Sequence, residues 1–197
     1  IVFCGVHFMA ESARVLSRPE QRVFLPEHGA GCPMADMVTP EGFRAAMAGL
    51  REAWGTEPVP VLYVNSSAEV KALAGEAGGV CCTSSNAARI VRSILETGRR
   101  FFFVPDENLG RNVAADLAAP VSGWPPEGDE SVAEARVAVW RGYGPIHERR
   151  LPADVAWARE RYPGCRLVVH PECTPEVVRL ADGAGSTAML LKEADRA

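Results

Sequence analysis

Short apolar runs alternate with stretches of helical periodicity along most of the chain. The apolar runs predict seven strands, at residues 1–6, 22–26, 59–65, 80–83, 100–105, 137–141 and 166–170. The stretches between them predict helices at residues 10–16, 41–54, 68–75, 87–97, 110–117, 152–162 and 175–181. Most of the predicted strands are apolar almost without interruption, which is typical of strands buried on both faces. The pattern therefore indicates an α/β fold in which helices cover both faces of parallel sheets.

The alternation is interrupted at three places, which suggest how the chain is divided. Residues 121–135 include the segment Pro125-Pro126-Glu127-Gly128 and predict a surface loop or an insertion. The predicted strands fall into groups separated by a glycine-rich turn at residues 29–32 and a loop at residues 142–147. This arrangement predicts several small α/β units rather than one wide sheet. Because the chain starts inside an apolar run and ends on a helical stretch, we expect both ends to continue in a longer protein.

Composition and charge narrow the class of protein. Of the 197 residues, 47% are apolar and 23% are charged, which is ordinary for a folded domain. The 21 basic and 25 acidic residues give a net charge of −4 without any cluster of Lys or Arg, so we expect no nucleic-acid partner. We also expect no membrane partner, because no apolar run has the length of a membrane span. Without a signal-peptide pattern, a cytoplasmic protein with reduced thiols is expected.

One of the six cysteines, Cys32, is distinguished by its position. It lies on the turn Gly29-Ala-Gly-Cys-Pro-Met-Ala-Asp36, after a predicted strand, where open α/β sheets bind their ligands. A free cysteine is also commonly a small buried apolar residue, so this segment alone leaves both interpretations open. Four other cysteines lie in or beside predicted strands, and we expect their thiols to be buried: Cys4, Cys81, Cys82 and Cys165.

Small polar residues follow several predicted strands directly before a helix. Four segments share this character, at residues 63–67, 82–86, 106–112 and 185–187. A helix N-terminus attracts anions, and Ser or Thr hydroxyls there add hydrogen-bond donors. Helix capping selects the same residue types and is the simpler interpretation of any single segment. The four segments together favour a site for phosphate or carboxylate groups.

Two histidines are further candidates for a site. His170 and Glu172 follow the last predicted strand, and two residues apart they can face one cleft. Such a pair suits acid–base chemistry or the binding of a polar substrate, although a solvated surface turn has the same pattern. Cys173 beside them is a weak candidate for a metal ligand. His147, in the loop after Trp140, either serves a site or caps the following helix.

Taken together, these segments resemble the quinolinate synthase family. The resemblance rests on motifs that keep their order along nearly the whole chain: Val6-His-Phe-Met-Ala-Glu11, Ala30-Gly-Cys-Pro-Met-Ala-Asp36, Tyr63-Val-Asn-Ser-Ser67, Cys82-Thr-Ser-Ser-Asn-Ala87, Pro105-Asp-Glu-Asn-Leu-Gly-Arg-Asn112, Trp140-Arg-Gly-Tyr-Gly-Pro-Ile-His147, His170-Pro-Glu-Cys173 and Gly185-Ser-Thr187. It implies a pseudo-threefold fold of three-layer αβα units with short parallel sheets, here without its N- and C-terminal parts. Residues 1–32 would be the remainder of the first unit, residues 33–143 the second, and residues 144–197 part of the third.

The resemblance also implies an activity in NAD biosynthesis. Enzymes of this family condense iminoaspartate with dihydroxyacetone phosphate to quinolinate, releasing phosphate and water. A [4Fe–4S] cluster held by three cysteines, one from each unit, leaves one iron open to bind substrate oxygen and act as a Lewis acid. L-Aspartate oxidase is a possible partner that supplies iminoaspartate.

The same resemblance assigns roles to individual residues. Cys32 matches the first cluster ligand. Tyr63, His170 and Glu172 match catalytic residues, and the last two match the pair that binds the substrate and assists its proton transfers. The positions that match substrate-binding residues are Asn65, Ser84, Ser186 and Thr187.

The chain departs from the family pattern at the second cluster ligand. There the family has a cysteine, whereas this chain has Gly144, which offers no ligating atom. The third ligand is expected beyond Ala197, and the spare thiols of Cys81, Cys82 and Cys173 do not match either position. Three hypotheses follow: an incomplete quinolinate synthase, a cluster-free α/β module that binds small anions, and an inactive paralogue with a binding or scaffolding role.

Overall fold

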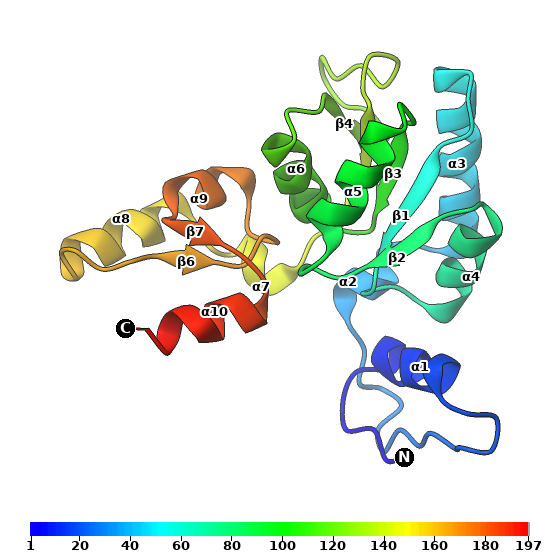
Figure 1. Ribbon diagram of the computed structural model, residues 1–197, viewed down its shortest axis with the longest axis horizontal. Helices are drawn as coiled ribbons and strands as arrows, with labels where there is room; N and C mark the ends of the chain where they lie inside the picture. The colour runs from blue at the N-terminus through cyan, green and yellow to red at the C-terminus, as the bar shows by residue number, and fades with distance from the viewer. Residues whose placement is uncertain (197) are drawn as a thin grey trace.

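The computed structural model describes residues 1–196, and its centre is a five-stranded parallel sheet (Figure 1). The strands are β1 (Val59–Tyr63), β2 (Val80–Cys82), β3 (Phe101–Val104), β4 (Val121–Trp124) and β5 (Val137–Trp140). They lie in the order β2-β1-β3-β5-β4, and each neighbouring pair is parallel. In the central pair, Val59 lies opposite Phe101 and Leu62 opposite Val104. The α/β class predicted from the alternation is therefore confirmed for this part of the chain.

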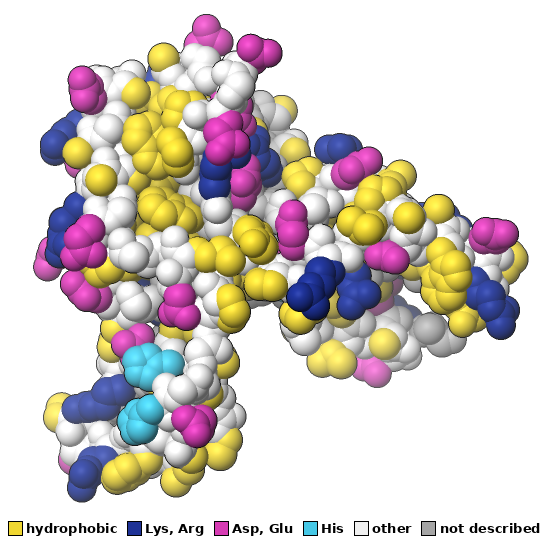
Figure 2. All heavy atoms as spheres, turned by 180° about the vertical axis from the view of Figure 1, so that it is seen from behind, with side chains coloured by type: hydrophobic (Ala, Val, Ile, Leu, Met, Phe, Trp, Pro, Cys, Tyr) yellow, Lys and Arg dark blue, Asp and Glu magenta, His cyan; other side chains and the backbone are white. Residues whose placement is uncertain are grey.

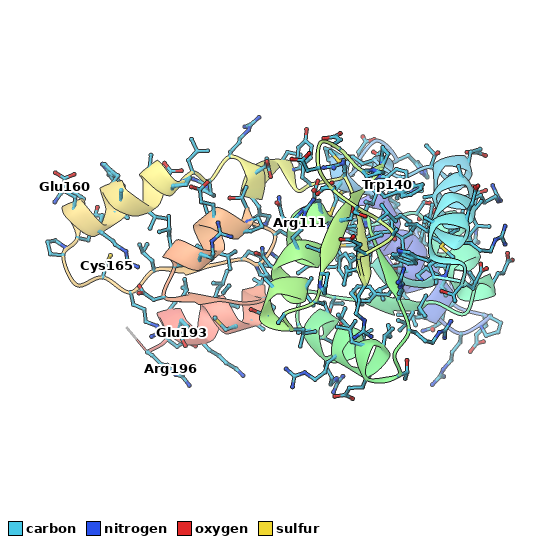
Figure 3. The ribbon with its side chains drawn as sticks, turned by 90° about the horizontal axis from the view of Figure 1, so that it is seen from above. Arg111, Trp140, Glu160, Cys165, Glu193 and Arg196 are labelled. Carbon is cyan, nitrogen blue, oxygen red and sulfur yellow. The ribbon has the colours of Figure 1, made fainter. Side chains whose placement is uncertain are left out.

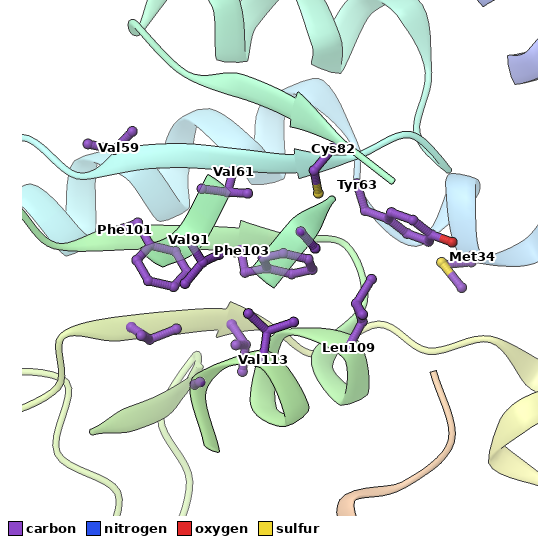
Figure 4. Close-up of a cluster of buried hydrophobic side chains, with 14 residues drawn as sticks. Met34, Val59, Val61, Tyr63, Cys82, Val91, Phe101, Phe103, Leu109 and Val113 are labelled. Carbon is purple, nitrogen blue, oxygen red and sulfur yellow. The ribbon is translucent and has the colours of Figure 1, made fainter. Parts of the chain in front are cut away.

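Helices cover both faces of this sheet. On one face lie α3 (Pro40–Trp54) and α4 (Ala68–Glu76), and on the other lie α5 (Ala87–Glu96) and α6 (Glu107–Asp116). Because strand residues alternate between faces, Phe102 packs toward α3 and α4, whereas Phe101 and Phe103 pack toward α5 and α6 (Figure 4). All three rings are fully buried, and each burial contributes roughly 1.5–3 kcal/mol. Two covered faces explain why β1, β3 and β5 are apolar at every position.

Side chains at the strand ends begin several of these helices. The hydroxyl of Ser67 accepts a hydrogen bond from the Val70 N–H at 3.3 Å, and Asp106 accepts from the Leu109 N–H at 2.6 Å. Capping, the simpler of the two sequence interpretations, therefore holds at these two strand ends. No helix among residues 1–196 has the length and apolar character needed to cross a membrane.

The strand order brings the ends of β1 and β3 to a point where the direction of winding reverses. From β1 the chain passes through α4 to β2 on one side, and then through α5 to β3 on the other side of β1. Open α/β sheets bind their ligands at such a point, beyond the carboxyl ends of the strands. Tyr63 ends β1 there, and Asp106 follows β3.

A smaller lobe follows the sheet and extends away from it, with Glu160 and Cys165 at its far end (Figures 1 and 3). It contains α7 (Pro145–Glu148), α8 (Pro152–Arg161), β6 (Val168–Val169), α9 (Pro175–Leu180), β7 (Gly183–Ala184) and α10 (Thr187–Ala194). Its core is small and includes Val155, Cys173 and Val177. The side-chain amide of Asn112 on α6 joins the lobe to the sheet unit, because it donates to the carbonyls of Pro171 at 2.8 Å and Cys173 at 2.9 Å.

The N-terminal segment forms a third region with few regular elements. It contains α1 (His7–Leu16), and exposed histidine side chains mark its surface when the molecule is seen from behind (Figure 2). The short helix α2 (Pro33–Asp36) follows this segment and lies against the sheet, where Met34 joins the buried core (Figure 1). The carboxylate of Glu11 on α1 accepts a hydrogen bond from the Ala68 N–H at 2.9 Å, which holds this segment against the start of α4.

Several predictions for the N-terminal segment, the edge strand and the cysteines were wrong. Residues 1–6 and 22–26 form a single bridge between Val2 and Phe24 rather than two strands, since both side chains are at least half exposed and no further strand among residues 1–196 pairs with them. Residues 121–135 include strand β4, which the pattern missed because Ser122 and Gly123 interrupt its apolar character. The expected burial is confirmed for Cys82 but wrong for Cys4 and Cys81, which are exposed, and Cys165 is half-buried.

Candidate functional site

The carboxyl end of β1 and the turn after β6 meet in a buried hydrogen bond. The Tyr63 hydroxyl donates to Oε1 of Glu172 at 2.6 Å. Both residues are only 5% exposed, and the Tyr63 ring extends past the end of its strand toward Met34 (Figure 4). Burial raises the pKa of Tyr63, and the negative charge of Glu172 raises it further. The phenol therefore keeps its proton and holds the carboxylate in place.

Two imidazole rings face the same carboxylate. Nε2 of His147 lies 3.7 Å from Oε2 of Glu172, and Nδ1 of His170 lies 3.6 Å from Oε1. The two rings stack, with their centroids 4.8 Å apart. Burial lowers the pKa of His170, although the charge of Glu172 opposes this shift. A carboxylate with two adjacent imidazoles can accept, hold or pass on a proton near neutral pH.

Gly144 lies directly against this group. A Cβ atom at position 144 would lie 2.7 Å from Oε2 of Glu172, 3.1 Å from Cε of Met34 and 3.3 Å from Cδ2 of His147. The backbone of Gly144 is extended, with φ −82° and ψ 110°, so any residue type could adopt its conformation. A side chain at position 144 would therefore require the Glu172 carboxylate to move, because Oε2 lies where that side chain would begin.

A second buried carboxyl, that of Asp106, belongs to the same region. Its Oδ1 caps α6, but its Oδ2 has no hydrogen-bond partner among the described residues. Burial raises the pKa of Asp106 well above its ordinary value, while the hydrogen bond from the Leu109 N–H opposes this and the charges of Glu172 and Glu148 reinforce it. The site thus combines one hydrogen-bonded carboxylate with one carboxyl that favours its protonated form.

The structure brings together the three residues predicted to be catalytic, Tyr63, His170 and Glu172. Ser84 lies close to Tyr63, and its hydroxyl counteracts part of the rise in the pKa of Tyr63. Asn65, Ser186 and Thr187 do not make a described hydrogen bond to this group. Asn65 and Ser186 are half-buried, whereas Thr187 is exposed at the start of α10.

The thiols of the chain do not fit a three-cysteine cluster. Cys32 is half-buried at the start of α2 and lines a small hollow with His7 and Glu11. Position 144, where the family resemblance expects the second thiol, has no ligating atom. Burial raises the pKa of both Cys82 and Cys173, so neither is a ready thiolate. The only group of possible metal ligands that converges among residues 1–196 contains no cysteine.

The geometry adds residues that the sequence did not assign. The sequence leaves two interpretations open for His147, and the structure places it beside Glu172 rather than at a helix cap. Asp106 and Asn112 belong to the polar segment 106–112, whose composition was a signal but did not identify them individually. Nothing in the sequence indicated that Gly144 touches Glu172, because that contact depends on how the lobe is placed.

Comparison with known proteins covers the whole chain. The family model described as NadA, quinolinate synthetase A protein, matches residues 1–197. The chain is similar to quinolinate synthases of Listeria monocytogenes (43% identity over 205 residues), Herpetosiphon aurantiacus (45% over 210) and Bacillus subtilis (42% over 205). In each case all of this chain aligns, but it spans only 56% of the length of the relative. The chain belongs to the quinolinate synthase family.

Proposed function

We propose that the protein forms quinolinate from iminoaspartate and dihydroxyacetone phosphate, with loss of phosphate and water. L-Aspartate oxidase is the proposed source of iminoaspartate. The family match over the whole chain supports this activity, and the buried group of Tyr63, Glu172 and His170 is the observation that carries it. In this proposal the fold is pseudo-threefold, with residues 1–32, 33–143 and 144–197 belonging to successive αβα units.

The proposed roles follow from the contacts of each side chain. Tyr63 holds Oε1 of Glu172, so the second carboxylate oxygen and the two imidazoles remain free to exchange protons with a substrate. Successive proton transfers of this kind are what a condensation followed by loss of water requires.

The remaining polar residues are proposed to bind the anionic groups of the substrates. Asn65 and Ser84 would hold carboxylate oxygens near Tyr63. Ser186 and Thr187, at the start of the eight-residue helix α10, would hold the phosphate or carboxylate of the second substrate. Such contacts would fix both substrates before the proton transfers begin.

The family implies a [4Fe–4S] cluster, and in this chain only Cys32 is proposed as a ligand. Gly144 supports a second candidate function, in which the protein binds a small phosphate or carboxylate anion without a cluster. The iron and sulfide contents after anaerobic cluster reconstitution distinguish the enzyme that holds a cluster from the anion-binding protein that holds none. The cluster-bearing enzyme should retain both elements and lose them on Cys32→Ser, whereas the binding module should retain neither.

Quinolinate formation by the complete protein tests the activity itself. Glu172→Gln keeps the size of the side chain but removes its charge, and we expect kcat to fall by roughly 10²-fold or more. Glu176→Gln is the matched control, because Glu176 is exposed on α9. Undiminished activity of Glu172→Gln, or no quinolinate from the unaltered protein, would refute the proposal.

A further inference from the structure

His147, His170 and Glu172 form the one convergent set of possible metal ligands among residues 1–196. One donor atom of each lies within 4.8 Å of the other two. The three come from two separate segments, α7 and the turn after β6, which places them around a common point rather than along one exposed face. His170 and Glu172 are buried, and His147 is partly buried.

The donors lie near the spacing that a metal ion requires. Donors about 2.1 Å from a tetrahedral zinc ion lie roughly 3.4 Å from one another. Nε2 of His147 lies 3.7 Å from Oε2 of Glu172, Nδ1 of His170 lies 3.6 Å from Oε1, and one donor atom taken from each residue lies within 4.8 Å of the other two. The Glu172 N–H is 3.4 Å from Nδ1 of His170, which is long for a hydrogen bond and leaves that nitrogen weakly held. Small side-chain movements would therefore complete the coordination.

The surroundings orient this donor set. Tyr63 fixes Oε1 of Glu172, which leaves Oε2 directed at His147 and Gly144. Sγ of Cys173 lies 3.9 Å from Nδ1 of His147, on the nitrogen that does not face the carboxylate. Outer partners of this kind fix ring orientation in protein metal sites and affect metal affinity by roughly 10–100-fold.

The charge of the site also favours a cation. Glu172 carries a buried carboxylate. Among the described residues, its side-chain oxygens have no lysine or arginine partner within 4.0 Å. A buried negative charge is costly unless it is paired or coordinates a metal.

We propose that His147, His170 and Glu172 bind a single divalent transition-metal ion of the Zn²⁺ or Fe²⁺ class. Two imidazoles and one carboxylate select such ions over Mg²⁺ and Ca²⁺, which prefer oxygen ligands throughout. Three protein ligands leave a coordination position for water or a substrate oxygen. This site requires no thiolate and does not rest on quinolinate formation; a bound metal ion and the proposed proton exchange are alternative uses of the same three side chains.

Binding of Co²⁺, a spectroscopic substitute for both ions, tests the site. The complete protein is stripped of metal with a chelator under anaerobic conditions, and Co²⁺ is titrated while visible d–d absorption is recorded. We expect one equivalent to bind without the charge-transfer absorption of a cobalt–thiolate bond. Glu172→Gln and His147→Ala should each weaken binding by at least roughly 100-fold.

Matched variants make the outcome decisive. His28→Ala removes an exposed histidine and should bind Co²⁺ as the unaltered protein does. Cys32→Ser should also bind normally, which separates this site from a cysteine-held cluster. Tyr63→Phe keeps all three ligands and should weaken binding by roughly 10-fold or more, so it tests the site even if His147→Ala does not fold. Failure of the unaltered protein to bind, unchanged binding by Glu172→Gln, or loss of binding in Cys32→Ser would overturn the proposal.

Discussion

Replacing Gly144 with alanine tests whether the Glu172 carboxylate occupies the space at position 144. The new Cβ would lie 2.7 Å from Oε2 of Glu172, which must retreat by at least about 0.7 Å to reach an ordinary contact. Such a retreat lengthens the 2.6 Å hydrogen bond from Tyr63 to the same carboxylate. The backbone at position 144 accepts alanine without strain, so crowding is the only source of the effect.

The expected cost can be worked from these contacts. Overpacking of a filled site costs about 1–3 kcal/mol, and weakening a hydrogen bond to a charged group costs about 1.5–3 kcal/mol when it is lost entirely. The two effects overlap, and the reduced freedom of the unfolded chain returns about 0.5 kcal/mol. We therefore expect the free energy of unfolding of Gly144→Ala to fall by about 2 kcal/mol, which lowers Tm by about 4–8 °C.

Thermal and urea unfolding of the complete protein measure this loss. Gly75→Ala is the matched control, because Gly75 lies on α4 with open space around it, and alanine there should stabilise by about 0.5–1 kcal/mol. In a Glu172→Ala background the cost of Gly144→Ala should shrink to about 0.5 kcal/mol. An equal cost in both backgrounds, or a Gly144→Ala protein as stable as the unaltered one, would refute the assignment.

Two further predictions concern residues that support the site. Burial raises the pKa of Asp106 in the folded protein, so as pH rises the unfolded chain loses this proton before the folded protein does. The free energy of unfolding should therefore decline as pH rises from about 4 toward the pKa of Asp106 in the folded protein. Asp106→Asn should remove that decline from urea midpoints measured between about pH 4 and 8, and parallel pH profiles would contradict this. Asn112→Ala removes the donor to the carbonyls of Pro171 and Cys173, so we expect a loss of about 2 kcal/mol in urea unfolding and a lower kcat; unchanged stability would contradict it.

The hydrophobic pattern correctly predicted the strands that are covered by helices on both faces of the sheet. β1, β3 and β5 carry apolar residues at nearly every position because helices cover both faces of the sheet. β4 lies at the sheet edge and contains Ser122 and Gly123, so its strand character comes from pairing with β5 rather than from its own residues. The strand predicted at residues 1–6 is wrong for the opposite reason. This segment is apolar but forms only an isolated bridge, and an apolar run without a paired neighbour does not make a strand.

The sequence names residues that the structure brings together, but it does not give their arrangement. The family resemblance assigns Tyr63, His170 and Glu172 to the site, and all three lie at or after strand ends, where open α/β sheets bind their ligands. Their actual contacts depend on the position of the small lobe, which Asn112 fixes through two backbone carbonyls. The burial of Asp106 likewise depends on tertiary packing, because its sequence signal was only that of a helix cap.

Position 144 links the family resemblance to the geometry of this chain. A thiol there and the Glu172 carboxylate in its present position exclude each other, because the first carbon of any side chain would lie 2.7 Å from Oε2. The missing cysteine has therefore not left an empty space: a carboxylate held by Tyr63 fills it and faces His147. In the metal site proposed above, the donors therefore differ in kind from the thiol that the family resemblance expects: nitrogen and oxygen atoms suit a single metal ion, whereas sulfur suits an iron–sulfur cluster.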